Sequence, residues 1–168
     1  MGKLIGIGGV SRSGKSSLAK QIKTHFSDKR VLILSQDKYV KEEKDIPKIR
    51  DRTDWEHPDS IDFPGILETI EENYAYDLII VEGLLAFYYP TLNESYNLRI
   101  ILKISMETFL SRRKKETRWG NEPHWYWVHV WESYLKYSKV APDQVIPISG
   151  EVSVNKQTLE EVVKNITS

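Results

Sequence analysis

The sequence predicts an α/β fold in which a five-stranded parallel sheet is flanked by helices. Short apolar runs alternate with helical patterns along the chain. The runs are continuously apolar, as expected of strands that are covered on both faces. The length of 168 residues gives room for one domain and not for two. We therefore expect a single domain over residues 1–168, with right-handed crossovers and a ligand at the carboxyl ends of the strands.

Each expected element has a local signal. The apolar runs that predict strands span residues 4–7, 31–34, 78–81, 99–104 and 145–148. Periodic apolar positions predict helices over residues 16–26, 63–70, 106–117, 128–137 and 158–166. Asp62 and Ser105 stand where side chains cap the second and third of these helices. Residues 38–61 are polar, without a clear period, and are expected to be mostly loop.

Composition excludes several classes of function. Lys+Arg and Asp+Glu each number 24, so the formal net charge is zero, which argues against nucleic-acid binding through bulk charge. The chain contains no cysteine, which excludes disulfides, thiolate zinc sites and cysteine nucleophiles. Its four histidines are scattered and form no zinc-binding spacing. The apolar N-terminal run is broken by glycines, and no stretch approaches 18 apolar residues, so we expect a cytoplasmic protein with no membrane partner.

A phosphate-binding loop follows the first predicted strand. Residues 9–16, GVSRSGKS, match the pattern G-x-x-x-x-G-K-[ST] in full. The glycines allow the backbone to curl so that several N–H groups point at one phosphate, and the following helix adds its positive end. Lys15 would place its charge on the β- and γ-phosphates, and the Ser16 hydroxyl would bind Mg²⁺. The sequence therefore predicts a P-loop that binds a nucleoside triphosphate.

Two carboxylates stand at the ends of the second and third predicted strands. Asp37 follows the second strand, and Glu82 ends the third. In a parallel sheet both lie at the edge that carries the phosphate loop. One of them could accept a proton from an attacking hydroxyl, and the other could hold Mg²⁺. The alternative is that each carboxylate only caps a helix or a turn.

A basic run and an aromatic segment follow the fourth strand. The run contains Arg112, Arg113, Lys114, Lys115 and Arg118, and the aromatic segment contains Trp119, Trp125, Tyr126, Trp127 and Trp131. The functional interpretation is a small lid over about residues 112–127, whose arginines close over the phosphates. The alternatives are a solvated helix face for the basic run and core packing for the aromatic side chains.

A GTPase is disfavoured by the sequence. Base recognition in such proteins uses an N-K-x-D pattern, whereas residues 155–158 read N-K-Q-T and lack the aspartate. Asp77 opens its strand instead of closing it, which makes it a poor magnesium ligand.

Several segments together resemble the uridine kinase and nicotinamide riboside kinase group of P-loop kinases. They are GIGGVSRSGKSSLA, LSQDKY, DWEHPDSID, LIIVEGLLAF, RRKKETR and HVWESYLKY, and they cover roughly residues 4–140. HVWESYLKY is especially similar to the nicotinamide riboside kinase version. The resemblance implies a nucleoside kinase-like P-loop NTPase fold, a three-layer sandwich with a small lid. It also implies ATP-dependent phosphorylation of a nucleoside 5′-hydroxyl, with Mg²⁺.

The resemblance also implies roles for individual residues. The expected catalytic residues are Asp37, Lys15 and Arg113, with Asp37 as proton acceptor. The expected ATP-binding residues are Gly9, Val10, Ser11, Arg12, Ser13, Gly14, Lys15, Ser16, Ser17, Arg112 and Arg118. The nucleoside is expected to contact Asp37, Tyr39, Trp55, Glu56 and Arg113, and the metal Ser16, Asp37 and Glu82.

The chain departs from the family pattern at two places. Glu56 stands where the family usually has aspartate, and the additional methylene moves a carboxylate by about 1.5 Å, which could alter its hold on ribose hydroxyls. Asp54 is the alternative carboxylate. The arginine run is also about two residues longer than expected. Three functions therefore stay open: a nucleoside kinase, a kinase for another acceptor such as pantothenate or a phosphorylated sugar, and a nucleotide-binding module without transfer activity.

Overall fold

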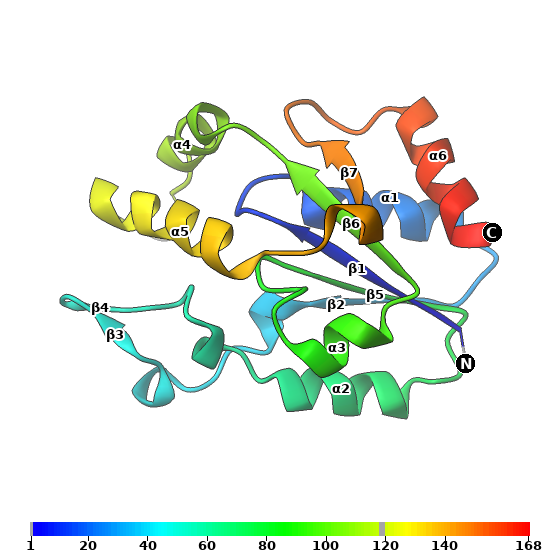
Figure 1. The fold of residues 1–168 in the computed structure, drawn as a ribbon, viewed down its shortest axis with the longest axis horizontal. Coiled ribbons are helices and arrows are strands. Elements are labelled where there is room, and N and C mark those ends of the chain that lie inside the picture. Colours follow the sequence, from blue (N-terminus) through cyan, green and yellow to red (C-terminus); the bar gives the residue numbers. More distant parts are fainter. Residues whose placement is uncertain (1, 118–119) are drawn as a thin grey trace.

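Five parallel strands form the central sheet of the computed structural model, which describes residues 2–117 and 120–168 (Figure 1). The strands are β1 (Lys3–Gly9), β2 (Val31–Ser35), β5 (Leu78–Gly83), β6 (Leu98–Lys103) and β7 (Ile146–Ser149). Their order in the sheet is β2-β5-β1-β6-β7, and every neighbouring pair is parallel. The predicted five-stranded parallel sheet is therefore confirmed.

Helices cover both faces of this sheet. They are α1 (Lys15–His25), α2 (Phe63–Glu72), α3 (Pro90–Ser95), α4 (Met106–Lys114), α5 (His124–Tyr137) and α6 (Lys156–Thr167). Side chains of α1 and α6 share one buried cluster with the sheet, and side chains of α2 and α3 share another. Figure 1 shows these pairs on opposite sides of the strands, with α4 and α5 beyond the ends of β1 and β6.

Strand β1 shows why the apolar runs of this chain are continuous. Ile5 and Ile7 point into the cluster under α1 and α6, whereas Leu4 points into the cluster on the opposite face. A Cβ at Gly8 would lie 2.4 Å from the ring of Phe87, so glycine lets this ring pack directly on the strand. Both faces of the strand are thus buried, as the sequence pattern predicts.

The two predicted helix caps are confirmed. Asp62 Oδ1 accepts a hydrogen bond from the Gly65 N–H at 3.1 Å at the start of α2. Ser105 Oγ accepts one from the Thr108 N–H at 3.1 Å at the start of α4. Each cap satisfies a backbone donor that has no partner within the helix itself.

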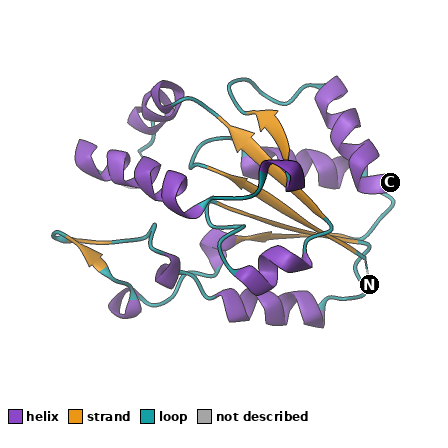
Figure 2. Ribbon diagram, viewed as in Figure 1, coloured by secondary structure: helices purple, strands orange, loops and turns teal. Residues whose placement is uncertain are grey.

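The sequence-based elements need four corrections. Residues 38–61 contain a short antiparallel hairpin, β3 (Lys48–Ile49) and β4 (Arg52–Thr53), which lies apart from the sheet (Figure 2). Strands of two residues are too short to produce a period in the sequence. Helix α3 was missed for the same reason, since it has only six residues. Helix α5 begins at His124, four residues earlier than predicted, and α4 ends at Lys114, three residues earlier.

Within the described residues, no helix has both the length and the apolar character that crossing a membrane requires.

Candidate active site

The phosphate loop joins β1 to α1 and has the backbone that its sequence predicts. Gly9 has a φ of +146° and Gly14 a φ of +100°, which L side chains rarely adopt. A Cβ at Gly9 would also lie 2.6 Å from Ser13 Oγ and 2.7 Å from the Leu102 carbonyl oxygen. Glycine is therefore required at the point where the loop turns away from the strand.

The start of α1 is open to an anion. No side chain of the described residues caps this helix, and its first turn carries no acidic residue. The backbone N–H groups of the first turn thus remain available to a ligand, with the positive end of the helix dipole behind them. Ser13 Oγ is buried and has no hydrogen-bond partner within the described part of the chain. These features fit a phosphate group.

Lys15 lies between the loop and three carboxylates. Its Nζ donates a hydrogen bond to the Val10 carbonyl oxygen at 2.9 Å. Burial lowers the pKa of Lys15 below its ordinary value, while Glu82, Asp37 and Glu56 oppose this shift and favour the charged form. The ammonium group is therefore a desolvated positive charge that faces acidic side chains.

Glu82 and Asp37 lie at the same edge of the sheet. In the register of the two strands, Ser35 at the end of β2 pairs with Glu82 in β5, and Asp37 follows in the turn after β2. Glu82 is buried, and its Oε1 accepts a hydrogen bond from Ser16 Oγ at 2.9 Å. Asp37 is exposed to the cavity described next. The parallel sheet thus brings together residues that are far apart in the sequence.

A cavity of about 860 Å³ joins these groups. The residues of the phosphate loop and helix α1 that line it are Ser11, Arg12, Gly14, Lys15, Ser16 and Ser17. Asp37 and Glu82 line it from the sheet edge, Trp55 and Glu56 from the loop after β4, and Arg112, Arg113 and Glu122 from α4 and the segment after it. The remaining lining residues are Arg52, Tyr126, Gln36, Val40, Ile61, Leu84 and Leu85. Most of the predicted site residues therefore share one space.

The carboxyl group of Glu56 is strongly perturbed. Burial raises its pKa to about 7, with the Arg113 charge opposing the shift and the charges of Asp37 and Asp54 adding to it. Asp54, the alternative carboxylate, does not line the cavity; its Oδ1 lies 2.7 Å from His129 Nε2. Glu56 is therefore the acid that this loop presents to a ligand.

The arginines are already engaged. Arg113 is buried; its Nε and Nη2 donate to the two carboxylate oxygens of Glu122 at 3.0 and 2.9 Å, and its Nη1 donates to Ser11 Oγ at 3.0 Å. Arg112 donates to the carbonyl oxygens of Arg12 and Glu151, both at 2.8 Å. These bonds tie α4 to the phosphate loop. Arg118, a predicted ATP contact, lies outside the described residues.

Two predicted substrate contacts differ in their placement. The Trp55 side chain is 44% exposed and lines the cavity. The Tyr39 hydroxyl instead donates to Thr69 Oγ1 of α2 at 3.1 Å, and Tyr39 is not among the residues that line the cavity. The structure therefore places Trp55, but not Tyr39, beside the phosphate loop.

The sequence interpretation missed several lining residues, among them two charged side chains and one tyrosine. Glu122, Arg52 and Tyr126 were given no role of their own, although Tyr126 belongs to the aromatic segment. Glu122 could have been noticed as the acid between the basic run and the aromatic helix. No sequence signal marks Arg52, because its position depends on how the hairpin folds.

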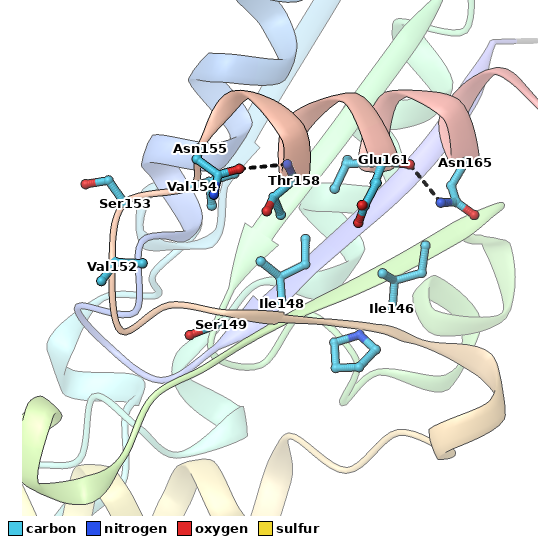
Figure 3. Close-up of a pocket in the computed structure, with 12 residues that line it drawn as sticks. Ile146, Ile148, Ser149, Val152, Ser153, Val154, Asn155, Thr158, Glu161 and Asn165 are labelled. Atoms are coloured by element: carbon cyan, nitrogen blue, oxygen red, sulfur yellow. Dashed lines mark hydrogen bonds between the residues drawn. The ribbon is translucent and has the colours of Figure 1, made fainter.

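A second cavity of about 400 Å³ lies between β7 and α6 (Figure 3). Its wall is formed by residues 146–149 and 152–155 and by α6. Two of its polar side chains bind within the helix: Asn155 Oδ1 accepts from the Thr158 N–H, and Asn165 Nδ2 donates to the Glu161 carbonyl oxygen. It contains none of the predicted site residues.

Comparison with known proteins shows what this chain is similar to. No protein-family model matches the chain. A uridine kinase from Bacillus anthracis is 26% identical over 200 aligned residues, which cover 98% of this chain and 93% of that protein. The solved structure of a sugar kinase from Janibacter sp. has a TM-score of 0.65 at 18% identity, over 99% of this chain and 95% of that one. The solved structure of a possible uridine kinase from Bacillus stearothermophilus has a TM-score of 0.56 at 16% identity, over 87% of this chain and 89% of that one.

The fold and the site define the class of this protein. The two solved structures share its fold, that of a P-loop NTPase, and the phosphate loop stands at the edge where such proteins bind their nucleotide. The chain is a small-molecule kinase of the P-loop type that uses ATP. Among such kinases it resembles the uridine kinase group, as the sequence motifs predict.

Proposed function

We propose that this protein transfers the γ-phosphoryl group of ATP to the 5′-hydroxyl of a nucleoside, either uridine-like or nicotinamide riboside. The observation that supports this most directly is the shared cavity of Lys15, Asp37, Glu56 and Glu82. It combines a loop suited to a triphosphate with acids suited to an alcohol. The name of the Bacillus anthracis relative supports a nucleoside as acceptor.

In the proposed reaction, Lys15 and the N–H groups of the phosphate loop hold the triphosphate. The oxygen of the acceptor hydroxyl forms a bond to the γ-phosphorus while the bond from that phosphorus to the bridging oxygen of ADP breaks. Asp37 accepts the proton of the hydroxyl. Arg113, whose Nη1 donates to Ser11 Oγ of the loop, would neutralise charge on the transferred group once Glu122 releases it. Positioning and electrostatics provide most of the rate enhancement.

Mg²⁺ fits the donor atoms at this edge. Ser16, Asp37 and Glu82 offer hydroxyl and carboxylate oxygens, the ligand type that Mg²⁺ prefers, and Ser16 and Glu82 are already hydrogen-bonded. These residues would hold the ion, which supplies charge neutralisation on the phosphates when bound.

The acceptor would lie against the loop after β4. In this proposal the Glu56 carboxylate accepts hydrogen bonds from the ribose hydroxyls, and Trp55 contacts the base. The segment 112–127 serves as the lid, and Glu122 releases Arg113 to the phosphates when the site fills. Glutamate instead of aspartate at position 56 leaves a sugar-like or other hydroxyl acceptor as the second candidate, which the sugar kinase fold neighbour also suggests.

An acceptor panel tests the proposal. The purified protein is incubated with ATP labelled in the γ-phosphate, Mg²⁺ and single acceptors: uridine, cytidine, nicotinamide riboside, gluconate and pantothenate. We expect label transfer to at least one nucleoside, with kcat/KM at least tenfold above that for any other acceptor. Transfer to gluconate or pantothenate without transfer to a nucleoside would contradict the proposal that the acceptor is a nucleoside. ATP binding without any transfer would indicate a nucleotide-binding module.

A further inference from the structure

The loop after β4 presents two neighbouring acids in different directions. Glu56 lines the large cavity, whereas Asp54 does not. The Asp54 carboxylate faces α5, where its Oδ1 lies 2.7 Å from His129 Nε2. The side chains of Asp54 and His129 are only 10% and 18% exposed, respectively. The contact joins residues 75 positions apart in the chain.

The same oxygen of Asp54 also reaches the backbone of Glu56. Asp54 Oδ1 accepts the Glu56 N–H at 3.2 Å, in addition to its contact with His129. One carboxylate oxygen therefore links α5 to the peptide unit that carries the Glu56 side chain. An ionised carboxylate only accepts hydrogen bonds, so the His129 ring donates from Nε2 in this contact.

Tyr126 supports the same loop one turn earlier on α5. Its hydroxyl accepts the Trp55 N–H at 3.3 Å and donates to the Thr53 carbonyl oxygen at 3.5 Å. Tyr126 and His129 are three residues apart, so they lie on one face of the helix, and their rings are 5.7 Å apart. This face of α5 thus binds the three consecutive residues 53–55, which end β4 and begin the loop after it.

We propose that His129 is a positioning residue for the acceptor site. Through Asp54 it fixes the backbone of Glu56, and so aims the Glu56 carboxylate into the cavity. The inference rests on the proposed function, because it assigns Glu56 to the acceptor. Lys15 and the phosphate loop belong to other elements, so we expect this contact to affect the nucleotide site much less than the acceptor site.

The loss of His129 has a defined consequence. Asp54 would keep a mostly buried carboxylate without its donor from α5, and it would turn toward solvent or toward other donors. The Glu56 N–H would then lose its acceptor, and the Glu56 side chain would lose its fixed direction. A displacement of about 1 Å at a positioning group can reduce the rate by about 10²-fold.

Kinetics of three variants test the proposal. His129→Phe removes the donor, and His129→Gln restores a donor near the same place. His25→Phe, at an exposed histidine in the last turn of α1, is the control for the same substitution away from the site. We expect His129→Phe to lower kcat/KM for the acceptor at least tenfold while KM for ATP changes less than twofold. His129→Gln should recover to within about threefold of the wild type, and His25→Phe should match the wild type.

Two outcomes of this experiment would overturn the positioning role. One is that His129→Phe behaves like His25→Phe. The other is that KM for ATP rises by the same factor by which kcat/KM for the acceptor falls, and that His129→Gln restores neither value. That result would indicate a general structural defect. The kinetics use whichever hydroxyl compound the wild type phosphorylates. The test of the positioning role therefore remains valid even if the acceptor is not a nucleoside.

Amide hydrogen exchange provides a readout that needs no activity. In His129→Phe, exchange of the Glu56 amide should accelerate at least tenfold, with little change in the phosphate loop. Unchanged protection of that amide would contradict the proposed link. If the wild type transfers phosphate to no acceptor, the proposed function fails while this exchange measurement still tests the link.

Discussion

Charges in the cavity lie close to groups of opposite sign. Lys15 faces Glu82, Asp37 and Glu56, and these carboxylates oppose the lowering of its pKa by burial. The arrangement concentrates positive charge where a triphosphate would bind and negative charge where a hydroxyl would lose its proton. In the proposed function, the side chains thus divide the cavity into a nucleotide end and an acceptor end.

Replacing Lys15 tests the nucleotide end. Lys15→Ala should weaken ATP binding and lower turnover together, each by about tenfold or more, because hydrogen bonds to charged groups contribute roughly 1.5–3 kcal/mol. Lys20→Ala, at an exposed position of the same helix, should leave both unchanged. Titration with a fluorescent ATP analogue and steady-state kinetics measure the two effects. Normal ATP binding in Lys15→Ala would contradict the assignment.

Glu56 should give the reaction a pH dependence near neutrality. Its pKa is raised to about 7, so the carboxyl is largely neutral below this pH and charged above it. As a charged acceptor of hydroxyl hydrogen bonds, it should make kcat/KM for the nucleoside rise between about pH 6 and 8. Glu56→Gln should remove this step and lower the plateau. If kcat/KM of Glu56→Gln rose by the same factor over this pH range, the pH dependence would belong to another group.

The same shift affects stability in the opposite direction. A carboxyl whose pKa is raised on folding stabilises the protein below its ordinary pKa of 4.5, and this contribution is lost as pH rises toward about 7. Urea unfolding at pH 5 and pH 8 should therefore show that Glu56→Gln gains stability relative to the wild type at the higher pH. A pH-independent difference between the two proteins would contradict the burial of this group.

At the scale of secondary-structure elements, α4 is joined to the segment before α5 by a buried ion pair. Arg113 and Glu122 have side chains only 6% and 11% exposed, and Arg113 also binds Ser11 of the phosphate loop. A buried pair contributes little beyond the cost of desolvating its charges, but removing one partner leaves the other charge uncompensated. The Arg113–Glu122 pair therefore holds the start of the proposed lid in place, and it also holds the lid against the phosphate loop.

Removing Glu122 tests this connection. Glu122→Ala should lower the free energy of unfolding by roughly 3 kcal/mol, because it leaves the Arg113 guanidinium buried without its acid. Glu160→Ala, which breaks the exposed pair with Lys156, should cost less than about 0.5 kcal/mol. Urea denaturation of both variants measures the difference. Equal losses in the two variants would show that the Arg113 pair behaves as a surface pair.

Elements with long apolar patterns could be predicted from the sequence, and short ones could not. The five strands, the helices α1, α2 and α6, and the caps Asp62 and Ser105 follow from local signals. Helix α3 and the hairpin β3–β4 are too short to show a period. The start of α5 at His124 was missed because its first turn carries bulky rings on several sides, which hides the helical period.

At the scale of the whole molecule, the parallel sheet determines which parts of the site are predictable. Strand order and direction bring the phosphate loop, Asp37 and Glu82 to one edge, so their proximity could be inferred from the sequence. The pairs Arg113–Glu122 and Asp54–His129 could not, because they depend on how α4, α5 and the hairpin pack. The same packing places Tyr39 against α2 instead of the cavity.

The central claim is that Asp37 activates an acceptor hydroxyl beside a triphosphate held by the phosphate loop. The most direct test follows ATP and a nucleoside by ³¹P NMR with the wild type and with Asp37→Asn. We predict that the wild type forms nucleoside monophosphate and ADP in equal amounts, and that Asp37→Asn does so at least about 100-fold more slowly while its ATP affinity falls much less than its rate. Equal rates for the two proteins, or release of inorganic phosphate instead of nucleoside monophosphate, would contradict the account.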